Sequence, residues 1–594
     1  MAIHGVAADG GWVQLGTEAE LRGPGPFGTT AAGAELVLVR AADGLRAFEG
    51  RCPHQGALLA EGEMAGDELV CRNHRWRFDA GTGLRRDGEG CLRQCPLLVR
   101  DGLLLARPAA VAPWAPARAA LRTVDQLPGP RGLPFLGALP ALDLDRLHLT
   151  LERWADRHGP VYRVDLGPRL VVAVSDPELI QQALRERPGA FRRLANIEPI
   201  FDELGIAGVF SAEGVAWRPL RRLTMEALSQ QHLRRFYPAL RRVAERLRRR
   251  WEAAADAGRT VEVEEDFKRF TVDLTTLLAF GHDLNTLEQE GDVLQRKLEK
   301  VFPGLNRRLF ALVPLWRLVK LPVERRLEAA VGEALEFLRG LLLAARARLQ
   351  ADPDRAAAPE TFLEAMIQAR DDDGRPFSDA QVLGNAIQIL VAGEDTTALT
   401  LSWAIHELCD HPETVAALQE EADRVLGGAL APADLEAVGR LEVAGAVAME
   451  TMRLRPVAPL LILDTNEETV LGDLALPRGQ SVALLMRHAA VSGEHFSDPG
   501  SFRPERWLRP ADHAPHTPSA HLPFGSGPRL CPGRSLALLE MRVALATLLG
   551  GFSLERVGTR AEVVERFAFT MGPRGLRVRL LRRNGSVGRA AAAG

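Results

Sequence analysis

A single cysteine in a glycine-rich loop is the first residue whose setting suggests chemistry. Cys531 lies in the stretch 521–549, HLPFGSGPRLCPGRSLALLEMRVALATLL, where an apolar helical pattern follows the loop. Pro532 favours the first position of a helix, so Cys531 is predicted to be the N-cap, where the helix dipole stabilises a thiolate. Gly527 allows a sharp turn, and Arg529 can bind a carboxylate through two N–H groups. A thiolate in such a loop suits a haem with cysteine as the axial ligand.

The spacing of five residues in this loop resembles the haem-binding loop of the cytochrome P450 superfamily. They follow the order FxxGxRxCxG and are Phe524, Gly527, Arg529, Cys531 and Gly533. The alternative is a structural cysteine before an ordinary helix, which is the usual fate of a lone buried cysteine. The resemblance implies bound haem b, with Cys531 as the ligand of the iron and with Phe524, Gly527 and Arg529 in the cofactor-binding loop.

A long apolar helix is predicted over 379–409, and it carries a polar sequence at its centre. Ser378 and Gln381 form a capping-box signature at its start. The body of the helix is apolar on nearly all sides, which is typical of a buried helix. The central residues 392–397 read Ala-Gly-Glu-Asp-Thr-Thr. Buried polar groups are costly unless they are used, which favours a functional centre over the alternative of a patch that faces solvent.

This polar centre resembles the oxygen-activating motif of cytochrome P450 monooxygenases. The resemblance implies that Gly393 leaves room for dioxygen, that Thr396 hydrogen-bonds the oxygen being activated and that Asp395 feeds a proton relay. These three residues are therefore the predicted catalytic residues.

Two further groups of residues match patterns of the same superfamily. Trp217 and Arg221 are four residues apart and share one helix face, and the resemblance implies that both hold a haem propionate. Glu450 and Arg453 match its ExxR pattern, and Arg506 follows in the sequence PERW. We expect Glu450, Arg453 and Arg506 to form a buried ion-pair network that shapes the haem pocket and has a structural role.

Two short boxes near the N-terminus each contain one cysteine and one histidine. Cys52 and His54 form the first box, and Cys71 and His74 belong to the second. Such a set can bind zinc, or a Rieske 2Fe–2S cluster in which one iron takes two thiolates and the other takes two imidazoles. The division of one cysteine and one histidine to each box favours the cluster. The flanking sequence resembles Rieske-type ferredoxins, which implies one 2Fe–2S cluster held by these four residues.

Other charged residues and cysteines lie close to these boxes. Arg51, Arg72 and Arg75 are hypothesised to stabilise the reduced cluster, with a docking rim as the alternative. Cys91 and Cys95 lie in a strand-like segment and are predicted to be small core residues. Six cysteines in so long a chain do not make a disulfide framework, which favours ligation of metals or cofactors.

The elements that position these residues fall into two predicted domains. Short strand-like runs separated by turns predict a small all-β Rieske-type domain over 1–108. Residues 109–126 are rich in alanine and proline and are predicted to be a semi-extended linker. A mainly α cytochrome P450 fold with minor β sheets is expected over 127–582, followed by a flexible tail at 583–594. The predicted fold class is therefore multidomain.

Composition excludes several classes of protein. The chain has 594 residues, of which 46% are hydrophobic and 25% are charged, with a net charge of −3. This balance gives no reason to expect a nucleic-acid partner. No signal-peptide pattern and no run of about 18 apolar residues occurs, so a cytoplasmic protein without a membrane anchor is expected.

The two resemblances together imply a fusion of a Rieske-type ferredoxin with a cytochrome P450 monooxygenase. We expect it to insert one oxygen atom of dioxygen into an organic substrate, with electrons passed singly from the cluster to the haem. A separate NAD(P)H-dependent ferredoxin reductase is the implied partner. The alternatives are a peroxide-driven or isomerising haem-thiolate enzyme, a Rieske non-haem oxygenase, and a haem sensor or electron carrier in which the Rieske domain serves for docking.

The substrate is predicted from three expected pocket walls. They are residues 196–212, residues 388–396 and the apolar run Pro459–Ile462, and the last of these favours a lipophilic substrate. A further apolar segment, 308–323, is predicted to pack in the core, with a membrane-touching lip as the alternative.

Overall fold

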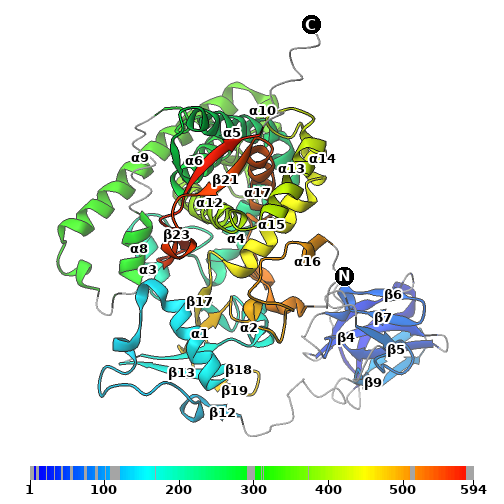
Figure 1. Cartoon of the computed structure of the whole chain (residues 1–594). Helices are drawn as coiled ribbons and strands as arrows, with labels where there is room; N and C mark the ends of the chain where they lie inside the picture. The colour runs from blue at the N-terminus through cyan, green and yellow to red at the C-terminus, as the bar shows by residue number, and fades with distance from the viewer. Residues whose placement is uncertain are drawn as a thin grey trace. The chain divides into compact units, whose positions relative to one another are not determined.

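The computed structural model divides into two compact units, Met1–Leu121 and Arg122–Gly594. Figure 1 shows the first unit in blue and the second from cyan to red. The structure describes the following residues: 6–8, 12–21, 23, 25–31, 34–41, 44–53, 58–71, 76–86, 91–100, 102–107, 121–167, 169–289, 301–309, 311, 314–371, 373–508 and 516–583.

The first unit is built from three small antiparallel sheets. Their strand orders are β1-β2-β11-β10, β3-β4-β5-β9 and β6-β7-β8. The strands are β1 Val6–Ala8, β2 Trp12–Thr17, β3 Phe27–Ala31, β4 Ala34–Ala41, β5 Gly44–Glu49, β6 Glu63–Ala65, β7 Glu68–Val70, β8 Arg77–Asp79, β9 Gln94–Cys95, β10 Leu97–Arg100 and β11 Leu103–Ala106. The predicted all-β fold of this part is confirmed.

Strand β4 shows how the sequence produces this unit. Its side chains alternate between the two faces of the sheet, as in any strand. Leu36 and Leu38 enter one hydrophobic core, whereas Val37 and Val39 enter a second core that also contains Cys52 and Cys71. Because both faces of β4 are covered, all four side chains are buried.

The two cysteines outside the boxes differ from each other. Cys95 ends β9 and is fully buried, so the prediction of a core cysteine is confirmed for this residue. Cys91 is exposed, and the same prediction is wrong for it. It lies in an isolated bridge to Leu84, and its side chain belongs to neither hydrophobic core of the unit.

The second unit is mainly helical. Its helices are α1 Leu147–His158, α2 Pro177–Arg185, α3 Ile197–Glu203, α4 Gly214–Ala227, α5 Gln230–Asp256, α6 Val263–Phe280, α8 Val301–Leu309, α9 Pro322–Ala351, α10 Pro353–Ala357, α11 Phe362–Gln368, α12 Asp379–Leu408, α13 Pro412–Leu426, α14 Leu435–Gly439, α15 Glu442–Leu454, α16 Glu505–Leu508 and α17 Arg534–Leu549. In the part of the chain that the structure describes, no helix is long and apolar enough to cross a bilayer.

Small sheets border the helices of this unit. The largest has the order β13-β14-β20-β17-β15, and the others are β12-β19-β18, β16-β24-β21 and β22-β23. The strands are β12 Arg122–Thr123, β13 Val161–Leu166, β14 Arg169–Val174, β15 Phe191–Arg193, β16 Thr260–Glu262, β17 Leu460–Thr465, β18 Thr469–Leu471, β19 Leu474–Leu476, β20 Ser481–Leu485, β21 Phe552–Arg556, β22 Val564–Phe567, β23 Met571–Arg574 and β24 Arg577–Arg582. The predicted mainly α fold with minor sheets is confirmed.

Helix α12 lies at the centre of the second unit, packed against α6, α9, α15 and α17 (Figure 1). Ser378 caps its first turn, and both halves of the predicted capping box are present: Gln381 N–H donates to Ser378 Oγ, and Ser378 N–H donates to Gln381 Oε1 at 2.9 Å. The predicted long buried helix is confirmed.

The start of the second unit differs from the predicted boundary at residue 127. Arg122–Thr123 form β12, which pairs with β19 in parallel, and Val124–Gln126 form a short 3-10 helix. The last residues of the predicted linker therefore belong to the second unit, because Arg122 is fixed to Asp473 by two hydrogen bonds. Residues 108–120 and the tail 584–594 lie outside the described residues.

The apolar segment before α9 is only partly packed. Trp316 is buried, as the predicted core packing requires. Leu315, Leu318 and Val319 are exposed by 58%, 80% and 59%, so that prediction is wrong for them. Between Pro314 and Pro322 the chain forms a 3-10 turn at Leu315–Arg317, and Trp316 is the buried side chain of this turn.

Candidate active site

The predicted cysteine lies just before α17 but does not cap it. Helix α17 begins at Arg534 with Gly533 as its N-cap, because Pro532 and Gly533 form a turn. The N-cap prediction for Cys531 is therefore wrong. The sulfur still lies at the helix N-terminus: burial raises the pKa of the Cys531 thiol, whereas hydrogen bonds from the Gly533 and Arg534 N–H groups act to lower it. This setting favours a thiolate once a metal binds the sulfur.

The loop before Cys531 has the turn that the glycines predicted. Gly527 has φ +69°, and a Cβ at this position would come within 2.7 Å of the Cα of Arg185. The N–H of Cys531 donates to the carbonyl of Phe524 at 2.9 Å and closes the loop. Gly527 and Phe524 thus fix the path of the chain that presents the sulfur.

Helix α4 brings Trp217 and Arg221 to this loop. Arg221 donates to the carbonyl of Leu530 at 2.7 Å. The guanidinium carbon of Arg529 lies 4.3 Å from the centroid of the Trp217 ring, and its Nη2 forms an ion pair with Glu213 at 2.6 Å. The structure therefore gathers three predicted residues beside Cys531.

Several arginines of this region have buried nitrogens without a hydrogen-bond partner among the described residues. They are Nε of Arg529, Nε and Nη2 of Arg187, and Nε of Arg193. Burial lowers the pKa of Arg187 and of Arg529 to about 10 each. Buried cationic donors of this kind require an anion. The two propionates of a haem supply such anions and Cys531 supplies the thiolate, so this set of residues fits the haem that the sequence predicts.

The centre of α12 is open, although the helix is otherwise buried. Ala392 is exposed, and Gly393, Asp395 and Thr396 are half-buried, between long stretches of buried residues. The hydroxyl of Thr396 donates to the carbonyl of Ala392 at 2.8 Å. A Cβ at position 393 would lie 3.2 Å from Oγ1 of Thr275, so glycine at this position allows α6 to pack closely against α12.

Asp395 is held by residues of two other elements. Its Oδ1 lies 3.3 Å from Nζ of Lys268 on α6, and its Oδ2 accepts a hydrogen bond from Thr570 at 3.3 Å. Lys268 also pairs with Glu264 at 2.8 Å. Burial acts to lower the pKa of Lys268, but the two carboxylates outweigh this effect and the pKa is raised. Sequence reasoning missed Lys268; its only signal was the scarcity of lysine in the chain.

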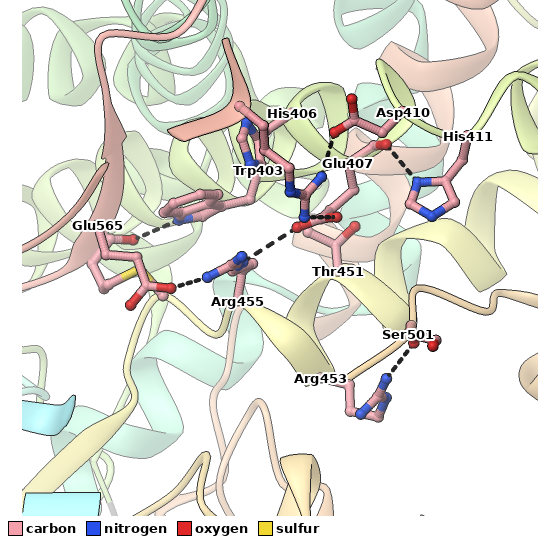
Figure 2. A network of polar contacts seen from close by, with 12 residues as sticks. Trp403, His406, Glu407, Asp410, His411, Thr451, Arg453, Arg455, Ser501 and Glu565 are labelled. Atoms are coloured by element: carbon pink, nitrogen blue, oxygen red, sulfur yellow. Dashed lines mark hydrogen bonds and ion pairs between the residues drawn. The ribbon is translucent and has the colours of Figure 1, made fainter. Parts of the chain in front are cut away.

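The predicted ion-pair network around Glu450 is present. Arg453 donates to both carboxylate oxygens of Glu450 at 2.9 and 2.8 Å, and Arg506 donates to Oε1 at 3.1 Å. Trp507 adds a hydrogen bond to Oε2 at 2.8 Å. Glu450 and Arg453 are fully buried, and Arg453 also donates to three carbonyls, including that of Ser501 (Figure 2).

In the first unit both predicted cysteine ligands lie in one core. Cys52 and Cys71 are 3% and 1% exposed and belong to the same hydrophobic cluster. His54 and His74 lie outside the described residues, as do Arg72 and Arg75. Arg51 forms an ion pair with Glu35, with a hydrogen bond of 3.0 Å. Glu35 therefore partly neutralises the positive charge with which Arg51 was hypothesised to stabilise the reduced cluster.

Two protein families match the two units. The family described as Cytochrome P450 matches residues 127–580, and the family described as Rieske [2Fe-2S] domain matches residues 11–95. The chain belongs to the cytochrome P450 family. It is a P450 monooxygenase with an N-terminal Rieske domain, and its cofactors are haem and a 2Fe–2S cluster. The predicted fusion is confirmed.

Similar proteins include monooxygenases from plants and fungi. Lutein deficient 5, a chloroplastic protein of Arabidopsis thaliana, is 26% identical over 70% of this chain and 71% of its own length. Carotene epsilon-monooxygenase of the same plant, also chloroplastic, is 28% identical over 69% of this chain and 77% of its own length. A self-sufficient cytochrome P450 monooxygenase of Penicillium camemberti is 27% identical over 78% of this chain, which spans only 44% of that protein.

A buried carboxyl group of the P450 unit was not expected from the sequence. Glu540 on α17 is 2% exposed, and burial raises its pKa to about 8, against the effect of a hydrogen bond to Thr397 of α12. The carboxyl group is therefore mostly protonated at pH 7. Its sequence signal is a single acid within the apolar run of α17.

A second polar network holds the C-terminal end of α12 in the P450 unit (Figure 2). Glu407 pairs with Arg455 at 3.2 Å and with Arg560 at 2.7 Å. Arg455 also pairs with Glu565, which lies 3.0 Å from Nε2 of the buried His148. The members come from α1, α12, β22 and the ends of other elements, so sequence patterns did not reveal the network.

Proposed function

We propose that the chain inserts one oxygen atom of dioxygen into a lipophilic organic substrate and that the Rieske unit is the electron donor of the P450 unit. The observation that carries this proposal is the opening at the centre of α12, where Thr396 and the Asp395–Lys268 pair lie in an otherwise buried helix. When bound, the haem supplies the iron at which dioxygen is reduced.

The residues of the Cys531 loop receive binding roles in this proposal. Cys531 is the iron ligand, while Phe524 and Gly527 shape the loop that presents it. Arg529, Trp217 and Arg221 hold the propionate edge, which is supported by the unpartnered Nε of Arg529 and by its contact with Trp217.

Three residues of α12 receive catalytic roles. In this proposal Gly393 leaves room for dioxygen, Thr396 donates a hydrogen bond toward the oxygen, and Asp395 passes protons from the side of the helix where Lys268 and Glu264 lie. Lys268 is a positioning residue, since it holds the Asp395 carboxylate.

Structural and domain assignments complete the proposal. Glu450, Arg453 and Arg506 fix the end of α15 to the segment that precedes the Cys531 loop and do not act on the substrate. In the Rieske unit Cys52, His54, Cys71 and His74 hold the cluster. We keep the predicted domain limits of 1–108 and 127–582, with a tail at 583–594 and a linker at 109–126 whose last residues, 122–126, pack with the second unit.

We further propose that a separate NAD(P)H-dependent ferredoxin reductase supplies the electrons. The two families occupy residues 11–95 and 127–580, and what lies between them is too short for a flavin or nicotinamide domain. A cytoplasmic location remains a prediction.

The proposal is tested by isotope labelling. The full chain is incubated with NADH, a ferredoxin reductase, ¹⁸O₂ and dodecanoic acid or a monoterpene alcohol as probe, and products are analysed by mass spectrometry. We expect NADH-dependent products that carry one ¹⁸O atom. Products formed equally from hydrogen peroxide without NADH, and unaffected by Thr396→Ala, would instead establish the peroxide-driven alternative.

A further inference from the structure

Two buried amide side chains on α12 have no part in the proposed roles. Asn385 is fully buried and Gln388 is 5% exposed, although the helix around them is apolar. Buried amides are costly unless their donors and acceptors are paired. Both amides bind the loop at 206–211, which lies in the connection between α3 and α4.

The amide of Gln388 binds this loop at both of its ends. The N–H of Phe210 donates to Oε1 of Gln388 at 2.7 Å. Nε2 of Gln388 donates to the carbonyl of Ile206 at 2.7 Å and to the hydroxyl of Ser211 at 2.9 Å. One side chain of α12 therefore fixes the loop through three hydrogen bonds, two of them to the main chain.

Asn385 and two glycines bring the loop directly against the helix. The N–H of Val209 donates to Oδ1 of Asn385 at 2.7 Å. A Cβ at Gly384 would collide with the carbonyl oxygen of Ala207, and a Cβ at Gly208 would lie 2.8 Å from the carbonyl oxygen of Gly384. The two main chains are therefore in contact at a distance that only glycine allows.

The face of α12 that binds the loop continues into the opening at the centre of the helix. Four residues at spacings of three, four and four positions lie along one stripe of this face: Asn385, Gln388, Ala392 and Thr396. The loop covers the first two, whereas Ala392 is exposed. Since Gln388 and Ala392 are about one helical turn apart, the loop forms the edge of the opening.

The side chain of Phe210 fixes the loop from its other side. The guanidinium carbon of Arg193 lies 3.8 Å from the centroid of the Phe210 ring. The rings of Phe201 on α3 and of Phe569, between β22 and β23, lie 5.7 and 5.8 Å from it. The loop is thus held by its main chain on α12 and by an aromatic side chain among three other elements.

We propose that Asn385 and Gln388 are positioning residues for substrate selection. They hold the 206–211 loop fixed against α12, so that the width of the substrate that reaches Thr396 is set before the substrate binds. This inference rests on the proposed function. A preorganised edge costs no ordering of the loop when a narrow ligand binds, and it excludes a wide ligand by steric overlap.

Two measurements on the haem-loaded full chain test this inference. Hydrogen exchange of the amides of 206–211, followed by mass spectrometry, reports how often the loop opens. Dissociation constants are measured by spin shift and equilibrium dialysis for 1-decanol, borneol and 1-adamantanol, which have equal numbers of carbons and one hydroxyl but increasing width. We expect 1-adamantanol to bind at least about 10-fold more weakly than 1-decanol.

Two variants release the loop by different routes. Gln388→Met removes three hydrogen bonds, whereas Gly384→Ala forces the loop away from α12 and leaves both amides in place. Each should raise the exchange rate of the loop by about 10-fold or more, as the loss of one or two hydrogen bonds predicts. Each should also reduce the preference for 1-decanol to within about threefold. If one variant does not fold, the other decides the question.

The matched control is Gln419→Met. The amide of Gln419 also joins two elements, α13 and β21, through the carbonyl of Phe552 at 3.1 Å and the hydroxyl of Ser553 at 3.2 Å. Its loss should change neither the exchange rate of the 206–211 loop nor the preference among the alcohols.

Three results would overturn the inference. The loop could exchange as fast in the wild type as in the two variants, or the wild type could bind the three alcohols equally or not at all. The variants could also open the loop and keep the preference, in which case the loop would not select the substrate. Failure of the proposed function is a separate result, because neither measurement uses NADH, a reductase or product formation.

Discussion

The catalytic assignment depends on a few side chains at the opening of α12. The hydroxyl of Thr396 donates a hydrogen bond to the carbonyl of Ala392. The hydroxyl can bind a ligand instead without disturbing the packing of the helix. Asp395 is already held by Lys268 and Thr570. In the proposed function the two residues have different tasks: Thr396 acts toward the oxygen, and Asp395 acts toward the source of protons.

Thr396→Ala should therefore uncouple NADH consumption from product formation. The product formed per NADH is expected to fall by roughly tenfold or more, because correctly placed proton transfer contributes about 10²- to 10⁴-fold to a rate. Both quantities are measured in the same reaction, by absorbance for NADH and by mass spectrometry for the product.

Ser402→Ala provides the matched control. Ser402 makes the same kind of bond, from its hydroxyl to the carbonyl of Ala398 at 2.8 Å, but it is fully buried further along α12. Its substitution should leave coupling unchanged. Equal coupling in wild type and Thr396→Ala would contradict the role of Thr396.

Helices of the P450 unit are held together by buried carboxylates, each of which accepts hydrogen bonds from several donors. Glu450 of α15 binds Arg453 of the same helix and joins α15 to α16 through Arg506 and Trp507. Removing one partner of such a set leaves buried charges without compensation, which costs more than the net value of the pairs.

Glu450→Gln should lower the free energy of unfolding by about 3 to 5 kcal/mol. Glu436→Gln is the control, because Glu436 pairs with Arg440 on the surface, with both side chains more than half exposed, and such pairs contribute about 0 to 1 kcal/mol. Denaturant titration followed by circular dichroism measures both variants. Similar losses in the two would show that the Glu450 network is not a major source of stability.

The polar network at the end of α12 also predicts a dependence on pH. His406 and His148 are buried, and burial is the main cause that lowers the pKa of each to about 4. The unfolded chain binds these protons near pH 6.5, whereas the folded chain does not until about pH 4. Stability is therefore lost as the pH falls through this window, by up to about 3 kcal/mol for each histidine.

His406→Gln should reduce the loss of folding stability that accompanies the fall in pH. The groups that face His406 are Glu407, Arg455, Arg556 and Arg560, and they remain in the variant. Thermal unfolding between pH 7.5 and 5 measures the slope, with His232→Gln, which replaces a half-buried histidine at the start of α5, as the control. An unchanged slope in His406→Gln would contradict the assignment.

Local sequence patterns correctly predicted many of the elements and side-chain networks of the P450 unit. Helix α12, its capping box, the ExxR network and the gathering of Trp217, Arg221 and Arg529 follow from local spacing and from the resemblance. The N-cap position of Cys531 was wrong because a turn at Pro532–Gly533 delays the helix. Lys268, Arg193 and the Glu407 network were missed, because their partners lie far away in the sequence and only the fold brings them together.

The whole molecule joins two units with complementary chemistry. In the proposed function the Rieske unit carries one electron at a time, and the P450 unit needs two electrons for each turnover. Fusion replaces a bimolecular encounter with an effective concentration of about millimolar order, provided that the linker allows the units to meet. The rate of electron delivery should then not depend on protein concentration.

The most direct test of the central claim is a stopped-flow measurement. Anaerobic protein under carbon monoxide is mixed with NADH and a catalytic amount of ferredoxin reductase, and the cluster signal and the ferrous–CO band of the haem are followed over a range of protein concentrations. We predict that haem reduction follows cluster reduction at a rate independent of protein concentration, and that Cys71→Ser abolishes both. A reduced cluster beside a persistently ferric haem, with or without dodecanoic acid, would contradict the claim that the Rieske unit feeds the P450 unit.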